Sequence, residues 1–408
     1  MTTPTLAEIE DAAEALRDVI VRTPLEESDH LSELLGVPVQ LKLENLQRTG
    51  SFKIRGATYR LSRLTPEERA RGVVAASAGN HAQGVALAAQ KLGIAATIFM
   101  PLGVPVPKLM ATRGYGADVI LEGDTVETPL RLAAEFAERT GAVLIHPFDH
   151  ADVIVGQGTL GLELWDDVPD LDTVILGIGG GGLAAGVAAA VKARAAAEGR
   201  TVRVIGVQAA NSAAYPSSLQ AGHPVAVATT PTIADGIAVA RPGDVPFEII
   251  RELVDDVVTV TDDDIARALL LLLERAKQVV EPAGAAGVAA ILAGKVQASG
   301  TTVVVLSGGN IDPLLLQRVV SHGLAASGRY MTLQIPLPDR PGQLARVSEL
   351  LSIAGANVIE VLHTRHGQGL QISEVILQLS VETRGTEHRA LVIKTLEDAG
   401  YTATILPD

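Results

Sequence analysis

The first three quarters of the chain alternate short apolar segments with segments of helical periodicity. Val73–Ala76 is a short apolar run typical of a buried strand, and the helical pattern at 82–92 ends at Gly93. Ala96–Met100 then begins the next unit of the same kind. Repeated units with strands this short predict an α/β fold with parallel sheets and right-handed crossovers.

The same pattern assigns most of the remaining elements before residue 310. Further strands are expected at 39–43, 118–121, 143–145, 173–176, 203–207 and 302–306. Helices are expected at 6–20, at a short segment ending near Gly36, at 105–114, 128–140, from 183, at 262–276 and at 284–293. Hydrophobic residues make up 47% of the chain and aromatic residues only 3%, so the core must be built from Ala, Val, Leu and Ile.

The last eighty residues follow a different order. Segments 331–337, 342–354, 357–365, 373–381, 386–398 and 402–406 are expected to form β-α-β-β-α-β. This is the ferredoxin-like order. Residues 323–329 are small and polar, which predicts a linker between a unit at 1–322 and a second unit at 330–408.

Charge and cysteine content limit the possible partners. The net charge of −14 argues against a nucleic-acid partner, because such binding needs a basic face. The absence of cysteine excludes disulfides and thiolate metal sites. The N-terminal segment is acidic without the pattern of a secretory signal, and no apolar stretch is long enough to cross a bilayer. We therefore expect a cytoplasmic protein with no membrane partner.

A tetraglycine loop is the first candidate binding site. Gly177–Leu183 lies between a predicted strand and a predicted helix. Consecutive glycines let main-chain N–H groups converge at a helix N-terminus, which suits a phosphate. The alternatives are a tight turn or a dinucleotide-binding fingerprint, although the glycine spacing does not match that fingerprint well.

Three more segments follow predicted strands or open predicted helices. Ser51-Phe52-Lys53 opens a helix, and its lysine is either a surface residue or a desolvated Schiff-base lysine. Ser77-Ala78-Gly79-Asn80-His81 is either a second anion site or an ordinary helix cap. Ser307-Gly308-Gly309-Asn310 follows the last parallel strand, where sites in α/β folds lie, or is a simple turn.

In order and spacing, these four segments resemble the threonine/serine dehydratase branch of the fold-type II pyridoxal-phosphate enzymes. The resemblance covers most of residues 15–322 and is strongest to threonine dehydratases (threonine ammonia-lyases). Supporting segments are Phe148-Asp149, Gly156-Gln157-Gly158-Thr159, Ala234-Asp235-Gly236 and Glu281-Pro282. It implies two open, twisted, mostly parallel sheets with flanking helices, the smaller subdomain spanning roughly residues 50–150.

The resemblance also implies a role for each matching residue. Lys53 would bond covalently to pyridoxal phosphate and act as the catalytic base. Around the cofactor, it places Phe52 and Gly236 at the faces of the ring, Asn80 at the 3′ oxygen, Gly179, Gly180, Gly181, Gly182 and Leu183 at the phosphate, Ser307 at the pyridine nitrogen, and Glu281 nearby in an undefined role. Ser77, Gly79, Asn80 and His81 would bind the substrate carboxylate.

The implied activity is conversion of L-threonine to 2-oxobutanoate and ammonia, and of L-serine to pyruvate. Alternatives are a serine or hydroxyaspartate dehydratase of the same fold, a nucleotide-dependent oxidoreductase, and a non-catalytic amino-acid sensor. Related serine racemases have a second serine where this chain has Ala78, so dehydration is favoured over racemisation. No carboxylate follows the strand at 203–207, so no divalent metal is expected there.

The tail resembles an ACT domain, an amino-acid-sensing module that usually pairs with another copy. The resemblance places an effector at Asp339, Gly342, Leu344 and Asn357. Isoleucine or valine is the expected effector, because threonine dehydration begins isoleucine biosynthesis. Paired regulatory modules imply a homodimer or a homotetramer.

Overall fold

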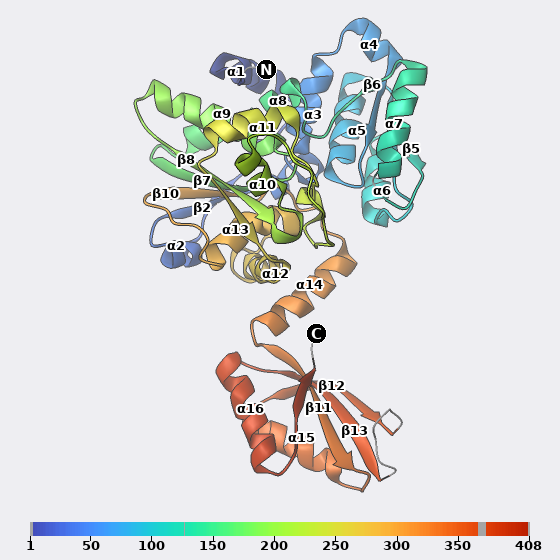
Figure 1. The fold of residues 1–408 in the computed structure, drawn as a ribbon, viewed down its shortest axis with the longest axis vertical. Coiled ribbons are helices and arrows are strands. Elements are labelled where there is room, and N and C mark those ends of the chain that lie inside the picture. Colours follow the sequence, from blue (N-terminus) through green and yellow to red (C-terminus); the bar gives the residue numbers. More distant parts are fainter. Residues whose placement is uncertain (1–2, 126, 366–372, 407–408) are drawn as a thin grey trace. The chain divides into compact units, whose positions relative to one another are not determined.

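The computed structural model of the chain describes residues 3–125, 127–365 and 373–406. These residues form two compact units, Met1–Pro313 and Leu314–Asp408 (Figure 1). The first unit contains two sheets and the second contains one. Each unit has its own hydrophobic core, and each is described separately below.

The larger sheet of the first unit has six strands in the order β1-β2-β10-β7-β8-β9. Their bounds are β1 (Leu25–Glu27), β2 (Val39–Lys42), β7 (Leu171–Gly177), β8 (Arg203–Ala209), β9 (Asp256–Val260) and β10 (Thr301–Val305). All neighbouring pairs are parallel except β1 and β2, which are antiparallel. This sheet confirms the α/β prediction, although β1 and β9 were not predicted.

The smaller sheet has four parallel strands in the order β5-β4-β3-β6. Their bounds are β3 (Val73–Ala76), β4 (Ala96–Met100), β5 (Asp118–Leu121) and β6 (Val143–Leu144). All four agree with the sequence prediction to within one residue. They lie within the stretch 50–150 expected for the smaller subdomain.

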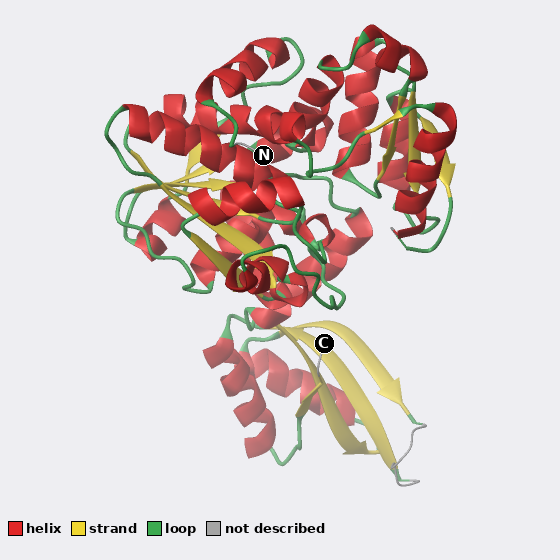
Figure 2. Cartoon of the chain, turned by 45° about the horizontal axis from the view of Figure 1, so that its top comes forward, coloured by secondary structure: helices red, strands yellow, loops and turns green. Residues whose placement is uncertain are grey.

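Helices connect and cover the strands of both sheets (Figure 2). They are α1 (Leu6–Leu16), α2 (Asp29–Leu35), α3 (Lys53–Ser62), α4 (Pro66–Arg71), α5 (Asn80–Leu92), α6 (Val106–Gly114), α7 (Glu127–Thr140), α8 (Ala151–Asp167), α9 (Gly182–Ala197), α10 (Ala214–Ala221), α11 (Asp244–Leu253), α12 (Asp262–Leu271) and α13 (Pro282–Leu292). The predicted helix at 262–276 is α12 followed by a π-helical turn at Leu272–Ala276. No helix among the described residues is long and apolar enough to span a membrane.

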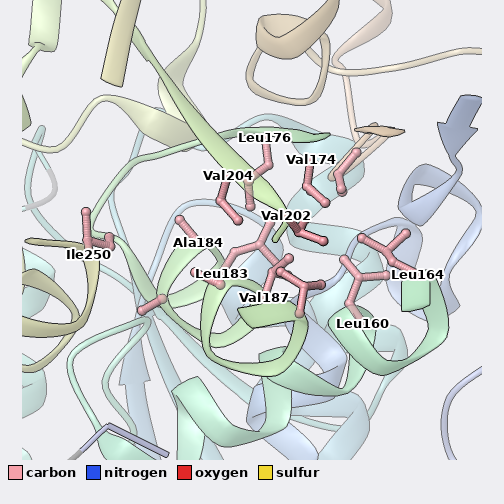
Figure 3. Packing of buried hydrophobic residues seen from close by; sticks show 14 of the residues in the cluster. Leu160, Leu164, Val174, Leu176, Leu183, Ala184, Val187, Val202, Val204 and Ile250 are labelled. Carbon is pink, nitrogen blue, oxygen red and sulfur yellow. The ribbon is translucent and has the colours of Figure 1, made fainter. Parts of the chain in front are cut away.

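Strand β7 organises the core of the larger sheet, because successive side chains point to opposite faces. Val174 and Leu176 pack in one cluster with Leu183 and Val187 of α9 (Figure 3). Ile175, between them, lies 3.4 Å from the position that a Cβ on Gly287 of α13 would take. Helices therefore cover both faces of the sheet, and the loop from β7 to α9 is held rigidly at its carboxyl edge.

The second unit consists of α14 (Pro313–Ala326), β11 (Tyr330–Pro338), α15 (Gln343–Ala354), β12 (Asn357–Thr364), β13 (Glu374–Glu382), α16 (Thr386–Asp398) and β14 (Thr404–Leu406). Its antiparallel sheet has the order β12-β13-β11-β14, which confirms the ferredoxin-like prediction. Helix α14 continues to Ala326, so the first four residues of the expected linker at 323–329 are helical. The chain divides at Pro313, earlier than the sequence indicated.

Candidate active site

Lys53 is the first residue of α3, and its side chain is half-buried. Its Nζ donates a hydrogen bond of 2.9 Å to the carbonyl oxygen of Pro147 and lies 5.1 Å from the centre of the Phe52 ring. Burial lowers the pKa of Lys53 to about 8, against the opposing effect of the Glu281 carboxylate. A lysine in this state is readily deprotonated and can act as a nucleophile and base.

The loop after β10 fixes the start of α3. The Phe52 main-chain N–H donates to the Ser307 carbonyl oxygen at 3.1 Å, and Ser51 forms an isolated β-bridge with Gly308. Ser307 itself is buried. Two segments that are more than 250 residues apart in the sequence are thus joined directly beside Lys53.

Asn80 and Glu281 meet in the same region. Asn80 begins α5, and its Nδ2 donates to Oε1 of Glu281 at 2.6 Å. Its Oδ1 accepts a hydrogen bond of 2.8 Å from Nδ2 of Asn310. A Cβ on Gly308 would lie 2.3 Å from the same Glu281 oxygen, so glycine is required for the carboxyl to fit.

Glu281 is a buried carboxyl group with a raised pKa. Burial raises its pKa to about 7, and repulsion from the Asp235 carboxylate adds to the effect. Lys108, the Asn80 hydrogen bond and Lys53 act in the opposite direction. Glu281 can therefore hold a proton near neutral pH while lying beside Lys53.

The tetraglycine loop runs from the end of β7 to the first residue of α9. A Cβ on Gly180 would lie 2.4 Å from the Phe148 ring, and one on Gly181 would lie 2.0 Å from the Tyr215 hydroxyl. Gly181 also has a φ of 106°, which favours glycine. A Cβ on Gly179 would lie 3.3 Å from the Gly236 carbonyl oxygen. The loop therefore has no room for side chains, and Leu183, which follows it, is buried.

Part of the 77–81 segment, which is expected to bind the substrate carboxylate, forms hydrogen bonds within the protein. The His81 ring is buried and its Nε2 lies 2.8 Å from the Ile145 carbonyl oxygen. Burial lowers the pKa of His81 to about 3, and nearby Lys53 adds to this, so the ring is neutral. The Gly79 N–H donates to Ser77 Oγ at 3.1 Å. The first turn of α5 still presents main-chain N–H groups that helix geometry leaves without intrahelical partners.

These residues fit pyridoxal phosphate. The glycine loop precedes the N-terminus of a buried 16-residue helix, where main-chain N–H groups favour a phosphate. The half-buried Lys53 and two further glycines, Gly236 and Gly308, lie around the same region. A Cβ on either glycine would approach Ala283 or Glu281. The donor set is thus one for an anionic, planar, carbonyl-bearing group.

Gln208 lies near the end of β8, so the strand extends beyond the predicted 203–207, and it places an amide where a carboxylate would favour a metal. Gln208 is buried, its Oε1 accepts a hydrogen bond of 2.8 Å from the Tyr215 N–H, and its Nε2 donates to the Ile178 carbonyl oxygen at 3.3 Å. Both ends of the amide are used within the fold. In the described part of the chain, no group of three or more His, Asp or Glu residues is placed to hold a metal ion.

The structure adds residues that sequence reasoning missed. Lys108 of α6 pairs with Asp235 at 3.3 Å. Arg55, two residues after Lys53, forms buried ion pairs of 2.8 Å with Glu44 and with Glu163. Arg55 follows the Ser51-Phe52-Lys53 motif closely, and this proximity was the one sequence feature that could have indicated its importance. Nothing in the sequence around Lys108 distinguishes it from a solvated lysine.

Three of the expected effector residues, Asp339, Gly342 and Leu344, lie near the end of β11. The expectation that Asn357 lies beside them within this unit is wrong, because Asn357 pairs with Glu382 at the opposite end of the sheet, where β11 begins. Gly342 has a φ of 91° and caps α15, and Leu344 is in the first turn of that helix. Asp339 forms a salt bridge of 3.2 Å with Arg365, and Asn357 begins β12. Asp339, Leu344 and Asn357 are exposed, so these positions are open to solvent in this unit.

Each of the two units matches a known protein family. The pyridoxal-phosphate dependent enzyme family matches residues 16–308, and the ACT domain family matches residues 331–400. The first match also identifies pyridoxal phosphate as the cofactor.

Individual relatives extend the match to the whole chain. The L-threonine ammonia-lyase of Thermotoga maritima is 46% identical over 403 residues, covering 98% of this chain and 99% of that protein. The catabolic L-threonine dehydratase of Escherichia coli is 46% identical over 75% of this chain and 92% of its own length.

Solved structures give the same result for the first unit. Tomato threonine deaminase isoform 2 is 38% identical, with a TM-score of 0.73 over 78% of this chain and 93% of its own. Maize serine racemase is 36% identical, with a TM-score of 0.74 over 79% of this chain and 99% of its own. The chain therefore belongs to the pyridoxal-phosphate-dependent enzymes, among the L-threonine ammonia-lyases with a C-terminal ACT domain.

Proposed function

We propose that this enzyme converts L-threonine to 2-oxobutanoate and ammonia by β-elimination followed by hydrolysis of the released enamine, and L-serine to pyruvate by the same route. The observation that carries the proposal is the half-buried Lys53 amine, with its lowered pKa, beside Glu281 and the Ser307 loop. The full-length similarity to L-threonine ammonia-lyases supports threonine as the first substrate.

Pyridoxal phosphate supplies an electron sink that stabilises negative charge at the substrate Cα. In our proposal the glycines 179–182 and Leu183 hold its phosphate, Phe52 and Gly236 flank its ring, Asn80 contacts its 3′ oxygen, and Ser307 faces its ring nitrogen. Lys53 Nζ takes the Cα proton, which its lowered pKa favours near neutral pH. Main-chain N–H groups of the 77–81 segment orient the substrate carboxylate.

The same chemistry applies to other β-hydroxy amino acids, so the test is a comparison of substrates. We would measure kcat/KM for L-threonine, L-serine and 3-hydroxyaspartate by keto-acid formation, together with D-serine production. Threonine should have the highest kcat/KM. D-serine should be absent, because Ala78 supplies no hydroxyl at the position where racemases have a serine. A higher value for serine or hydroxyaspartate would replace threonine in the proposal, and a protein without any keto-acid product would favour the sensor alternative.

We further propose that isoleucine or valine binds at Asp339, Gly342 and Leu344 of one second unit, against Asn357 on the strand of a paired copy, and changes the activity of the first unit. The left-handed Gly342 at the start of α15 supports this, because the following main-chain N–H groups suit an amino-acid carboxylate. We also propose a homodimer or homotetramer, since ACT modules act in pairs. Light scattering of the purified enzyme would measure its oligomeric state.

A further inference from the structure

Lys108 has a more restricted position than a surface lysine on an exposed helix. It lies on α6, yet its side chain is only 11% exposed. A Cβ placed on Gly79 would be 3.6 Å from Lys108 Nζ and 3.9 Å from its Cδ. The ammonium group therefore lies directly over the 77–81 segment, to which the proposed function assigns the substrate carboxylate.

The partner of Lys108 comes from the other sheet layer of the same unit. Asp235 belongs to the short helix Asp235–Ile237, between β8 and β9 of the larger sheet, and its carboxylate is 3.3 Å from Lys108 Nζ. Gly236, the next residue, approaches Gly179 of the phosphate-binding loop. The ion pair thus spans from the smaller sheet layer to the loop that flanks the proposed cofactor position.

The Lys108–Asp235 ion pair is weak enough for Lys108 to exchange Asp235 for another anion. The Asp235 side chain is 60% exposed, and exposed ion pairs contribute little stability because water screens them. The lysine end is shielded, so the ammonium remains near the 77–81 segment whichever anion it contacts. Both charges also reach Glu281, whose acidity Asp235 and Lys108 shift in opposite directions.

An amino-acid carboxylate bound at the 77–81 segment needs a positive charge nearby. His81 is neutral and contacts the Ile145 carbonyl, and Lys53 is assigned to the cofactor. Lys108 is a cation at the required place. We propose that Lys108 is a substrate-positioning residue whose ammonium pairs with the carboxylate of the bound amino acid, and that Asp235 holds this ammonium in place before the substrate arrives.

This inference rests on the proposed function, so its test uses ligands that need no turnover. L-Alanine and L-alaninamide share an amine and a methyl group, and differ in that alaninamide has an uncharged carboxamide instead of the carboxylate. Neither has a β-hydroxyl to eliminate. Calorimetry with the holoenzyme gives the dissociation constant of each. The variants are Lys108→Met and Lys108→Gln, with Lys91→Met, an exposed lysine at the end of α5, as the matched control.

We expect both Lys108 variants to weaken alanine binding at least tenfold while changing alaninamide binding less than twofold. Lys108→Arg should keep most of the alanine affinity, and Lys91→Met should change neither ligand. Equal weakening of both ligands would show that Lys108 only shapes the site and would overturn the proposal. Unchanged alanine binding would overturn it too.

The Asp235→Asn variant distinguishes two roles for Lys108. Lys108 either pairs with the substrate carboxylate or only holds the structure together through its ion pair with Asp235, as a latch. If Asp235 competes with the substrate for Lys108, this variant binds alanine as well as or better than the wild type. If the ion pair is a latch, it loses alanine affinity as Lys108→Met does, which would contradict the proposal. A wild type that binds alanine but does not act on threonine would refute the proposed function alone, so the two failures are distinguishable.

Discussion

The Asn80 side chain donates a 2.6 Å hydrogen bond to the Glu281 carboxyl, joining the first turn of α5 to the residue that precedes α13. This contact links the smaller sheet layer to the larger one at the position of Lys53. It gives Glu281, whose role was undefined at the level of sequence, a definite place as a proton-holding group in the site. Its acidity therefore has a measurable consequence.

Glu281 should make stability fall with rising pH in the cofactor-free protein. Its folded-state pKa of about 7 lies above the ordinary value of 4.5, so the folded state binds more protons than the unfolded state between these values. Its contribution is fully present below about pH 4.5 and is lost as the pH rises through 7. The shift corresponds to roughly 3 kcal/mol.

Urea denaturation of the wild type and of Glu281→Gln across this pH range measures the difference. The free energy of unfolding of the variant should lack this pH-dependent contribution. It should therefore increase relative to that of the wild type as the pH rises from 4.5 to 8. Parallel pH profiles for the two proteins would show that Glu281 ionises normally.

Arg55 should be essential for stability, because it is a fully buried cation held by two carboxylates. Its guanidinium makes two hydrogen bonds of 2.8 Å to Glu44 and one to Glu163. Arg55→Met leaves both carboxylates without this partner, and breaking a buried pair in this way costs about 3–5 kcal/mol. Denaturant unfolding gives the value, and Arg17→Met, at an exposed pair, should cost under about 1 kcal/mol. Similar losses for both variants would contradict this account.

Gly180→Ala should weaken cofactor binding at least tenfold. The added Cβ would lie 2.4 Å from the Phe148 ring, so either the ring or the phosphate-binding loop must move. Gly103→Ala is a suitable control, because no atom lies within 4 Å of the new Cβ and the backbone is not left-handed. Titration of each protein with pyridoxal phosphate, followed by absorbance, measures the affinity. Equal affinities would mean that the loop does not hold the phosphate.

Asn357→Ala should reduce or abolish the response to isoleucine or valine without changing basal turnover. Asn357 is exposed at the start of β12, outside the catalytic unit, and its loss removes a polar contact to the effector. Initial rates with and without each amino acid measure the response. Lys394→Ala, an exposed change on α16, is the control and should respond like the wild type. A normal response in Asn357→Ala would place the effector elsewhere.

The sequence predicted the short strands well because each is a compact apolar run with clear boundaries. Val73–Ala76 and Ala96–Met100 have the same bounds in the structure as in the prediction. Helix α8 (Ala151–Asp167) was missed for a physical reason. Gly156, Gly158 and Gly161 lower its helix propensity, and it is buried on nearly all sides, so it lacks an amphipathic pattern.

Those glycines exist for packing that the sequence does not display. A Cβ on Gly156 would lie 2.7 Å from the Cα of Gly56 in α3, and one on Gly161 would lie 2.7 Å from the Cβ of Ala190 in α9. Close helix contacts thus override local propensity here. The site shows the same division. The motif residues around Lys53 were identified from the sequence, whereas Lys108 depends on a tertiary contact with Asp235.

The most direct test of the account is to locate the cofactor on the chain. The purified holoenzyme would be reduced with borohydride, which fixes an imine as a stable amine, and its peptides would be analysed by mass spectrometry. We predict a phosphopyridoxyl mass increment on Lys53, with loss of the visible absorbance band and of 2-oxobutanoate formation in Lys53→Ala. An increment on another lysine, or a Lys53→Ala variant that keeps the band and the activity, would contradict the central claim.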